Sequence, residues 1–229
     1  QEYSDAINNA NTPASIKNAS VSVSNVNFAM TFSNTNLTVI DLEGVNASNN
    51  VLNVDACSSL TYLNLGGATV GNVDASVASM QSVNLLGTTI NGYADFSNAT
   101  SLQRITVDTK ITGALTATGC TNLMRISNTG TIGSIAANGS TGDGNTLTRL
   151  STFINSGTVG DVNLSYTGLS NVTNTGTVDN FTATNCSSLT ALSMAGTVNG
   201  DINLTDCDNL ASLNVANATI NNQGTSTGD

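Results

Sequence analysis

Residues 57–70 carry the sequence Cys-Ser-Ser-Leu-Thr-Tyr-Leu-Asn-Leu-Gly-Gly-Ala-Thr-Val, and variants of this stretch recur as far as residue 220. Leu60, Leu63 and Leu65 follow the pattern Leu-x-x-Leu-x-Leu. The last two positions of this pattern share one face of a β-strand, because strand side chains alternate in direction. The step Ala68-Thr69-Val70 follows, and we expect the chain to turn there and to start a second strand.

The stretch recurs with the period of a solenoid protein. Its apolar anchors follow one another at intervals of 19 to 23 residues, with one longer step, and are Leu37, Leu60, Met80, Leu102, Leu123, Leu150, Leu169, Leu189 and Leu210. The longer step contains residues 139–146, a polar segment that predicts an inserted loop. A coil of about 21 residues cannot bury its own apolar face, so neighbouring coils must stack, at the strand spacing of about 4.8 Å.

The predicted fold is therefore an all-β repeat solenoid with about nine coils of about 21 residues over residues 37–220. Residues 1–36 do not match the repeat and form the expected N-terminal cap or assembly segment, and residues 221–229 form a polar tail. We expect the following residues of the second strand to point inward: Val73, Ala75, Leu115, Ala117, Ile135, Ala137, Val162, Leu164, Phe181, Ala183, Ile202 and Leu204.

Composition excludes several functional classes. The chain of 229 residues has only 9% charged residues, a net charge of −10 and five basic residues, which is not the electrostatic pattern of a nucleic-acid-binding protein. No apolar run approaches the roughly 18 to 20 residues that span a bilayer. The chain has no histidine, which excludes a His-based catalytic triad, and neither a G-x-S-x-G motif nor a phosphate-binding loop occurs. We therefore expect no enzyme, no cofactor and no metal site.

The chain begins at Gln1 without a methionine, from which we expect that a targeting segment or a longer precursor was removed. Polarity comes mainly from Asn, Ser, Thr and Gly rather than from charge. This composition points to a secreted or cell-surface protein.

The segments that begin at Cys57, Cys186 and Cys207 resemble the leucine-rich repeats of bacterial cell-surface proteins. This resemblance covers residues from about 37 to 220 and implies an adhesin or a ligand-binding surface. Small residues, mostly Gly or Ala, replace the ladder asparagine of that family, so a straighter β-helix competes with the leucine-rich-repeat geometry. Asn128, Asn155 and Asn174 favour the β-helix, because their stacked amides would form a hydrogen-bonded ladder.

Each of the four cysteines, Cys57, Cys120, Cys186 and Cys207, lies three residues before a repeat anchor. Repetition explains this placement without chemistry, so buried free thiols are the favoured interpretation. Cys186 and Cys207 belong to adjacent coils, and a disulfide between them is the alternative.

The best candidate for a binding patch is the outward column of the first strand. Tyr62, Ser82, Arg104, Arg125, Thr152 and Asn171 are expected to stack in this order, and Tyr62, Arg104, Arg125 and Asn171 are the candidate binding residues. Arginine and tyrosine side chains suit an acidic or sugar ligand through bidentate hydrogen bonds and aromatic stacking. The alternative is that the two arginines offset nearby acidic charge.

A second regular surface is a threonine column interrupted by Lys110, which contains Thr69, Thr89, Thr131, Thr158, Thr177, Thr197 and Thr219. Threonine arrays at strand spacing resemble the ice-binding faces of some solenoid antifreeze proteins. Alternatively, these hydroxyls bond to backbone groups of the turn.

We expect an extracellular structural or adhesive protein that self-associates head to tail or binds an extracellular protein or glycan, without nucleic acid and without membrane insertion. An ice-binding protein is the second hypothesis. The third is a carbohydrate-binding or carbohydrate-active β-helix, for which Asp161, Asp179 and Asp201 recur near the threonine step, although turns also favour aspartate.

Overall fold

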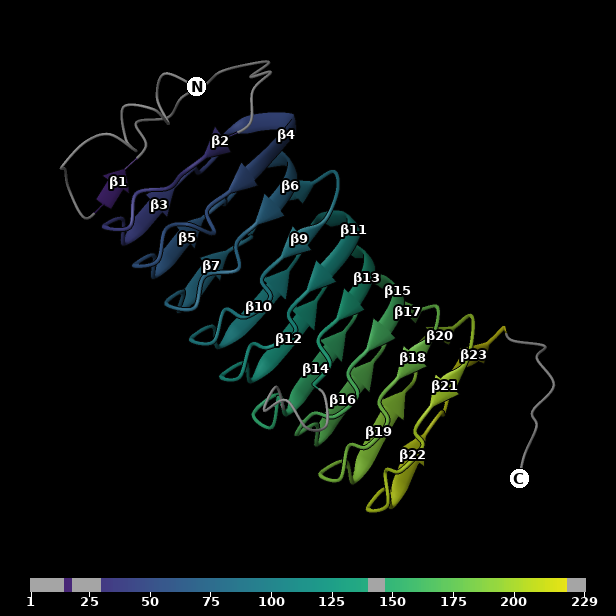
Figure 1. The fold of residues 1–229 in the computed structure, drawn as a ribbon. Coiled ribbons are helices and arrows are strands. Elements are labelled where there is room, and N and C mark those ends of the chain that lie inside the picture. Colours follow the sequence, from purple (N-terminus) through teal and green to yellow (C-terminus); the bar gives the residue numbers. More distant parts are fainter. Residues whose placement is uncertain (1–14, 18–29, 140–146, 222–229) are drawn as a thin grey trace.

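A computed structural model describes residues 15–17, 30–139 and 147–221. These residues form a β-solenoid of parallel strands and contain no helix, so none that could span a membrane. Figure 1 shows the coils stacked one behind another along a single axis. The predicted all-β solenoid with coils of about 21 residues is confirmed.

One side of the solenoid carries the first strand of each coil, and it is divided into two sheets. Sheet A consists of β1 (Ser15–Lys17), β3 (Val39–Asp41), β5 (Tyr62–Asn64) and β7 (Ser82–Asn84). Sheet C consists of β10 (Arg104–Val107), β12 (Arg125–Asn128), β14 (Thr152–Asn155), β16 (Asn171–Asn174), β19 (Ala191–Met194) and β22 (Ser212–Asn214).

The other side is one continuous sheet, sheet B, built from the second strand of each coil. Its strands are β2 (Met30–Thr31), β4 (Asn46–Asn53), β6 (Thr69–Asp74), β8 (Thr89–Ile90), β9 (Ala94–Asp95), β11 (Lys110–Thr116), β13 (Thr131–Ala136), β15 (Thr158–Asn163), β17 (Thr177–Val178), β18 (Phe181–Thr182), β20 (Thr197–Val198), β21 (Ile202–Asn203) and β23 (Thr219–Ile220). The second strand starts at the threonine of the repeat, as predicted.

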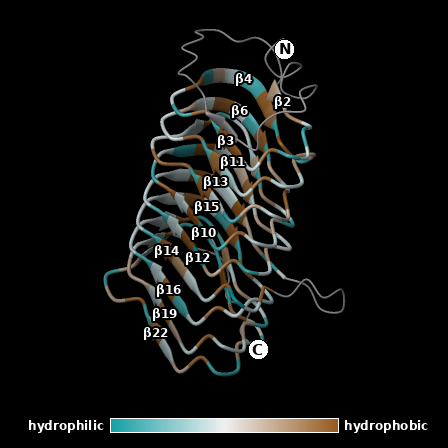
Figure 2. Ribbon diagram, turned by 90° about the vertical axis from the view of Figure 1, so that its left-hand side faces the viewer, coloured by the Kyte–Doolittle hydropathy of each residue, from teal (hydrophilic) through white to brown (hydrophobic). Residues whose placement is uncertain are grey.

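The core lies between the two sides. Leu60, Leu63 and Leu65 are fully buried, and Phe153 on β14 meets Phe181 on β18 across the interior with ring centroids 6.0 Å apart. Figure 2 shows hydrophobic and hydrophilic residues alternating along the coils. The expected inward residues of the second strand are buried, except that Ile202 and Leu204 are half-buried. Ile202 lies on β21, which pairs with β18 of the preceding coil and with no described strand of the following one.

Two parts of the expected N-terminal cap are described. β1 pairs in parallel with β3, and β2 pairs in parallel with β4, so both segments extend the sheets of the solenoid. The expected inserted loop lies outside the described residues except for Gly139, and so does the tail from residue 222 onward.

Two kinds of corner join the first side to sheet B. In the first, Leu63 and Val70 are seven residues apart, and Gly67 has a φ of +67°. In the second, Ile126 and Ile132 are six residues apart. The corner shortens between the coils of β7 and β10, where sheet A ends and sheet C begins. It lengthens again in the coil of β22, where Leu213 and Ile220 are seven residues apart.

Candidate functional site

The outward face of sheet C is formed by two columns of side chains that follow the strand register. The first column contains Arg104, Arg125, Thr152, Asn171, Ala191 and Ser212, and the second contains Thr106, Ser127, Ile154, Thr173, Ser193 and Asn214. None of the six strands contains an Asp or Glu. Apart from Ile154 and Ala191 this face is polar, and its strands carry only positive formal charge.

Arg104 and Arg125 are register partners on the neighbouring strands β10 and β12, and both side chains are exposed. The Arg125 guanidinium donates a hydrogen bond of 3.3 Å to the Oγ of Ser127. Within the described part of the chain, neither arginine forms an ion pair with a carboxylate. The alternative that these arginines offset nearby acidic groups therefore finds no contact that supports it.

The predicted outward column is divided rather than continuous, which corrects part of the sequence interpretation. Tyr62 and Ser82 are register partners in sheet A, whereas Arg104, Arg125, Thr152 and Asn171 stack in order in sheet C. No register pairing joins Ser82 to Arg104, since sheet A ends at β7 and sheet C begins at β10. The structure thus brings Arg104, Arg125 and Asn171 onto one sheet and places Tyr62 on another.

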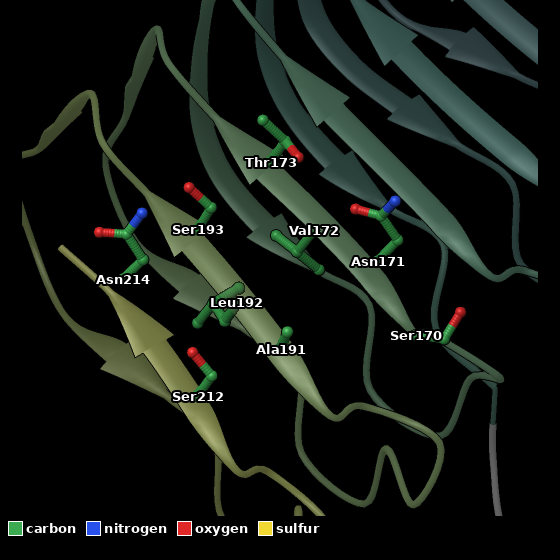
Figure 3. A pocket seen from close by; sticks show the side chains of 9 residues that line it. All are labelled: Ser170, Asn171, Val172, Thr173, Ala191, Leu192, Ser193, Ser212 and Asn214. Atoms are coloured by element: carbon green, nitrogen blue, oxygen red, sulfur yellow. The ribbon is translucent and has the colours of Figure 1, made fainter. Parts of the chain in front are cut away.

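Two hollows lie on the outward face of sheet C. The first, of about 470 Å³, is lined by Arg104, Thr106, Met124, Arg125, Ser127, Ser151 and Thr152. The second, of about 350 Å³, lies between β16, β19 and β22, and Figure 3 shows the Asn171, Thr173, Ser193 and Asn214 side chains around it. Both hollows offer hydroxyl or amide groups for hydrogen bonding.

The buried side of the same sheet contains the predicted asparagine ladder, which is confirmed. The amide of Asn128 donates to the Oδ1 of Asn155 at 2.8 Å, and the amide of Asn155 donates to the Oδ1 of Asn174 at 2.7 Å. All three side chains are fully buried. Because buried polar groups need partners, this ladder aligns β12, β14 and β16 and holds their outward residues in place.

Sequence reasoning missed a second ladder on sheet A. The amide of Asn64 donates to the Oδ1 of Asp41, and the amide of Asn84 donates to the Oδ1 of Asn64, both at 2.8 Å. The signal was present, since Asp41, Asn64 and Asn84 each follow the second apolar residue of the repeat pattern. Sequence reasoning also missed the second outward column of sheet C, which includes the hollow-lining Thr106 and Ser127.

The threonine column lies in register along sheet B, with Lys110 between Thr89 and Thr131. Over the described chain, no side-chain hydrogen bond involves the hydroxyl of any threonine in the column, which contradicts the alternative that these hydroxyls bond to the turn. Thr131, Thr158 and Thr219 of this column are exposed, and its other threonines are half-buried. A second hydroxyl row, Thr129, Ser156 and Thr175, lies two residues earlier and is exposed. Glycines separate the rows.

The four cysteines are buried free thiols, as the repeat predicted. Each thiol lies against a carbonyl of the preceding coil; for example, the Cys120 Sγ is 3.0 Å from the oxygen of Phe96. Burial raises the pKa of Cys57 to about 11 and that of Cys120 to about 12, and it also raises the pKa of Cys207. These three side chains are therefore protonated at neutral pH and are weak nucleophiles.

The three carboxylates considered for catalysis lie on the outer side of sheet B or at its corners. Asp161 accepts a 2.6 Å hydrogen bond from the amide of Asn180, and Asp179 accepts a 2.9 Å hydrogen bond from the amide of Asn199. Asp201 donates its backbone N–H to the Oδ1 of Asn180. These contacts join consecutive coils, which is a structural role. No group of three or more metal-binding side chains occurs in the described ranges.

No protein-family model matches the chain, and the comparisons with curated proteins and with solved structures found nothing similar to it.

Proposed function

We propose that this protein is an extracellular adhesive solenoid that binds a surface ligand through the outward face of sheet C. The observation that carries the proposal concerns the two outward columns of side chains on this face. They contain no Asp or Glu, and they border two hollows lined by hydrogen-bonding side chains. The resemblance of the repeats to those of bacterial cell-surface proteins supports it. Stacked coils contact only their neighbours and build an extended, stiff surface, which suits adhesion to a large or repetitive ligand.

A retention experiment tests this proposal. The protein is applied to a panel of immobilised neutral and acidic polysaccharides and to whole cells, together with the variants Ser193→Tyr and Thr182→Tyr. Ser193 lines the hollow in Figure 3, so its replacement by tyrosine is expected to fill the hollow and to reduce retention. Thr182 lies on β18 in sheet B and serves as the control, with unchanged retention. Equal retention of both variants, or retention on no member of the panel, would contradict the proposal.

Head-to-tail self-association is part of the same proposal. In the last described coil, Leu213, Val215 and Ile220 are 39–53% exposed, whereas their equivalents in the coil before it, Leu192, Met194 and Val198, are buried. Contact of this coil with a second copy would cover these side chains, and a heterologous contact of this kind propagates into a filament. Light scattering on the sample used for retention provides the check: a mass that rises with concentration supports association, and a monomer at every concentration refutes it.

Ice binding is the second candidate function, and one specific observation favours it. At the corners of three consecutive coils, two hydroxyl rows flank a row of glycines: Thr129-Gly130-Thr131, Ser156-Gly157-Thr158 and Thr175-Gly176-Thr177. All of these hydroxyl residues are exposed except Thr177, which is half-buried. Backbone hydrogen bonds of 2.7–2.9 Å join these corners from coil to coil, so the rows are held at a fixed repeat. A rigid hydroxyl array with no protein partner among the described residues is suited to ordering water.

We expect the protein to lower the freezing point of a solution below its melting point if this second function is correct. The variant with Thr158→Tyr and Thr177→Tyr should lose most of that difference, because tyrosine breaks the flatness of the array. Nanolitre osmometry measures both values. The absence of a freezing–melting gap in the unmodified protein at millimolar concentration would rule out ice binding.

A further inference from the structure

We infer that Arg104 and Arg125 bind the carboxylates of an acidic polysaccharide across β10, β12 and β14. The inference rests on the proposed function, since it names the ligand class of the same face. It commits to sugar-borne carboxylates, that is, to a chain of uronic acid units. Four features of the structure support it: the pairing of the arginines, their lack of acidic partners, the charge of the surrounding sheet and the lining of the hollow.

The two arginines are placed side by side by the register of parallel strands. Arg104 on β10 pairs with Arg125 on β12, and neighbouring strands lie about 4.8 Å apart. The positive charges of two arginines on neighbouring strands repel each other, so their placement contributes nothing favourable to folding by itself. An anion between the two guanidinium groups removes the repulsion and gains charge-assisted hydrogen bonds.

No acidic side chain among the described residues bonds to Arg104 or Arg125. In the ranges that the structure describes, the Arg104 side chain has no hydrogen bond or ion pair, and the Arg125 side chain bonds only to Ser127. Asp108, which follows β10, accepts a 2.9 Å hydrogen bond from the backbone of Gly87 instead. The Arg104 guanidinium therefore keeps its donors available to a ligand, and the Arg125 guanidinium keeps those that do not bond to Ser127.

Charge is distributed unequally between sheet C and sheet B. The chain has fifteen acidic and five basic residues, yet the strands of sheet C contain two arginines and no acid. Sheet B carries Asp74, Asp95 and Asp161 on its strands. An anionic polymer is therefore repelled by most of the surface and attracted to the face of Arg104 and Arg125. This charge distribution directs binding of the polymer to sheet C.

The hollow around the arginines is lined by groups that can bind both the carboxylate and the hydroxyls of a sugar acid. A planar guanidinium matches a carboxylate with two parallel hydrogen bonds, which the ammonium of lysine cannot do. Thr106, Ser127 and Thr152 line the same hollow of about 470 Å³ and supply hydroxyls for the ring hydroxyls of a sugar, while Met124 supplies apolar contact. A chain with one carboxylate on each unit can engage both arginines at once.

Titration calorimetry with an oligomer of galacturonic acid tests the inference, and the matching galactose oligomer is the neutral probe. We expect the acidic oligomer to bind and the neutral one not to bind. Arg104→Gln and Arg125→Gln should each weaken binding about tenfold, as expected for the loss of one charge-assisted contact. Arg104→Lys should recover only part of the affinity. Lys110→Gln, which removes one exposed positive charge from sheet B, is the matched control and should leave binding within about twofold of the unmodified protein.

Several outcomes would overturn the inference. Unchanged affinity in the double variant Arg104→Gln/Arg125→Gln would place the ligand elsewhere. Binding to a sulfated galactan but not to the galacturonic acid oligomer would reject the carboxylate. Retention on neutral polysaccharides that is indifferent to both arginines would reject this inference and leave the proposed adhesion intact, whereas absence of retention on every surface would reject the proposed function itself.

Discussion

Replacing Gly157 by alanine is expected to prevent stable stacking of the central coils. A Cβ at this position would overlap the carbonyl oxygen of Gly130 in the preceding coil and would lie 2.6 Å from the carbonyl carbon of Thr129 and 2.8 Å from the backbone nitrogen of Gly130. All three atoms belong to the backbone, so no side chain can move aside. We expect a loss of about 5 kcal/mol or more in the free energy of unfolding, which is at the upper end for a single substitution.

Urea denaturation followed by circular dichroism measures this effect, and Gly44→Ala is its matched control. Gly44 has a φ of +69°, but an added Cβ would find nothing within 4 Å. Its substitution therefore adds only the cost of a left-handed backbone, about 1–2 kcal/mol. If Gly157→Ala lowers the free energy of unfolding no more than Gly44→Ala does, the coils do not approach each other this closely at Gly157.

Replacing Asn155 by alanine is expected to have the next largest effect. Its amide donates to Asn174 at 2.7 Å and to the carbonyl oxygen of Thr177 at 3.0 Å, and its Oδ1 accepts from Asn128 at 2.8 Å. Alanine leaves polar atoms without partners in the dry interior and also leaves a cavity. Since each unsatisfied buried group costs about 1–3 kcal/mol, we expect a total loss of about 4 kcal/mol.

Asn171→Ala is the control for this variant, because Asn171 lies on the neighbouring strand β16 with an exposed side chain and should change stability by less than about 0.5 kcal/mol. Both variants are compared by their urea midpoints. A shift for Asn155→Ala as small as that for Asn171→Ala would show that the ladder contributes nothing to stability.

The sequence predicted the repeat, the anchors and the threonine step because these depend on periodicity. A side chain that recurs every coil must occupy the same place in each coil, so the burial of Leu60, the free cysteines and the asparagine ladder could all be derived from spacing. The interval between successive anchors sets the coil length, which is a property of the chain alone.

What the tertiary structure alone decided is how the columns connect. The boundary between sheets A and C after β7 separates Tyr62 from Arg104. The bonds of Asp161, Asp179 and Asp108 to the adjacent coil show that these carboxylates hold neighbouring coils together rather than pair with the arginines. The availability of Arg104 and the tight contact at Gly157 likewise depend on which atoms of the preceding coil lie within reach. Spacing determines which residues recur, whereas contacts between coils depend on backbone positions that a one-dimensional period does not contain.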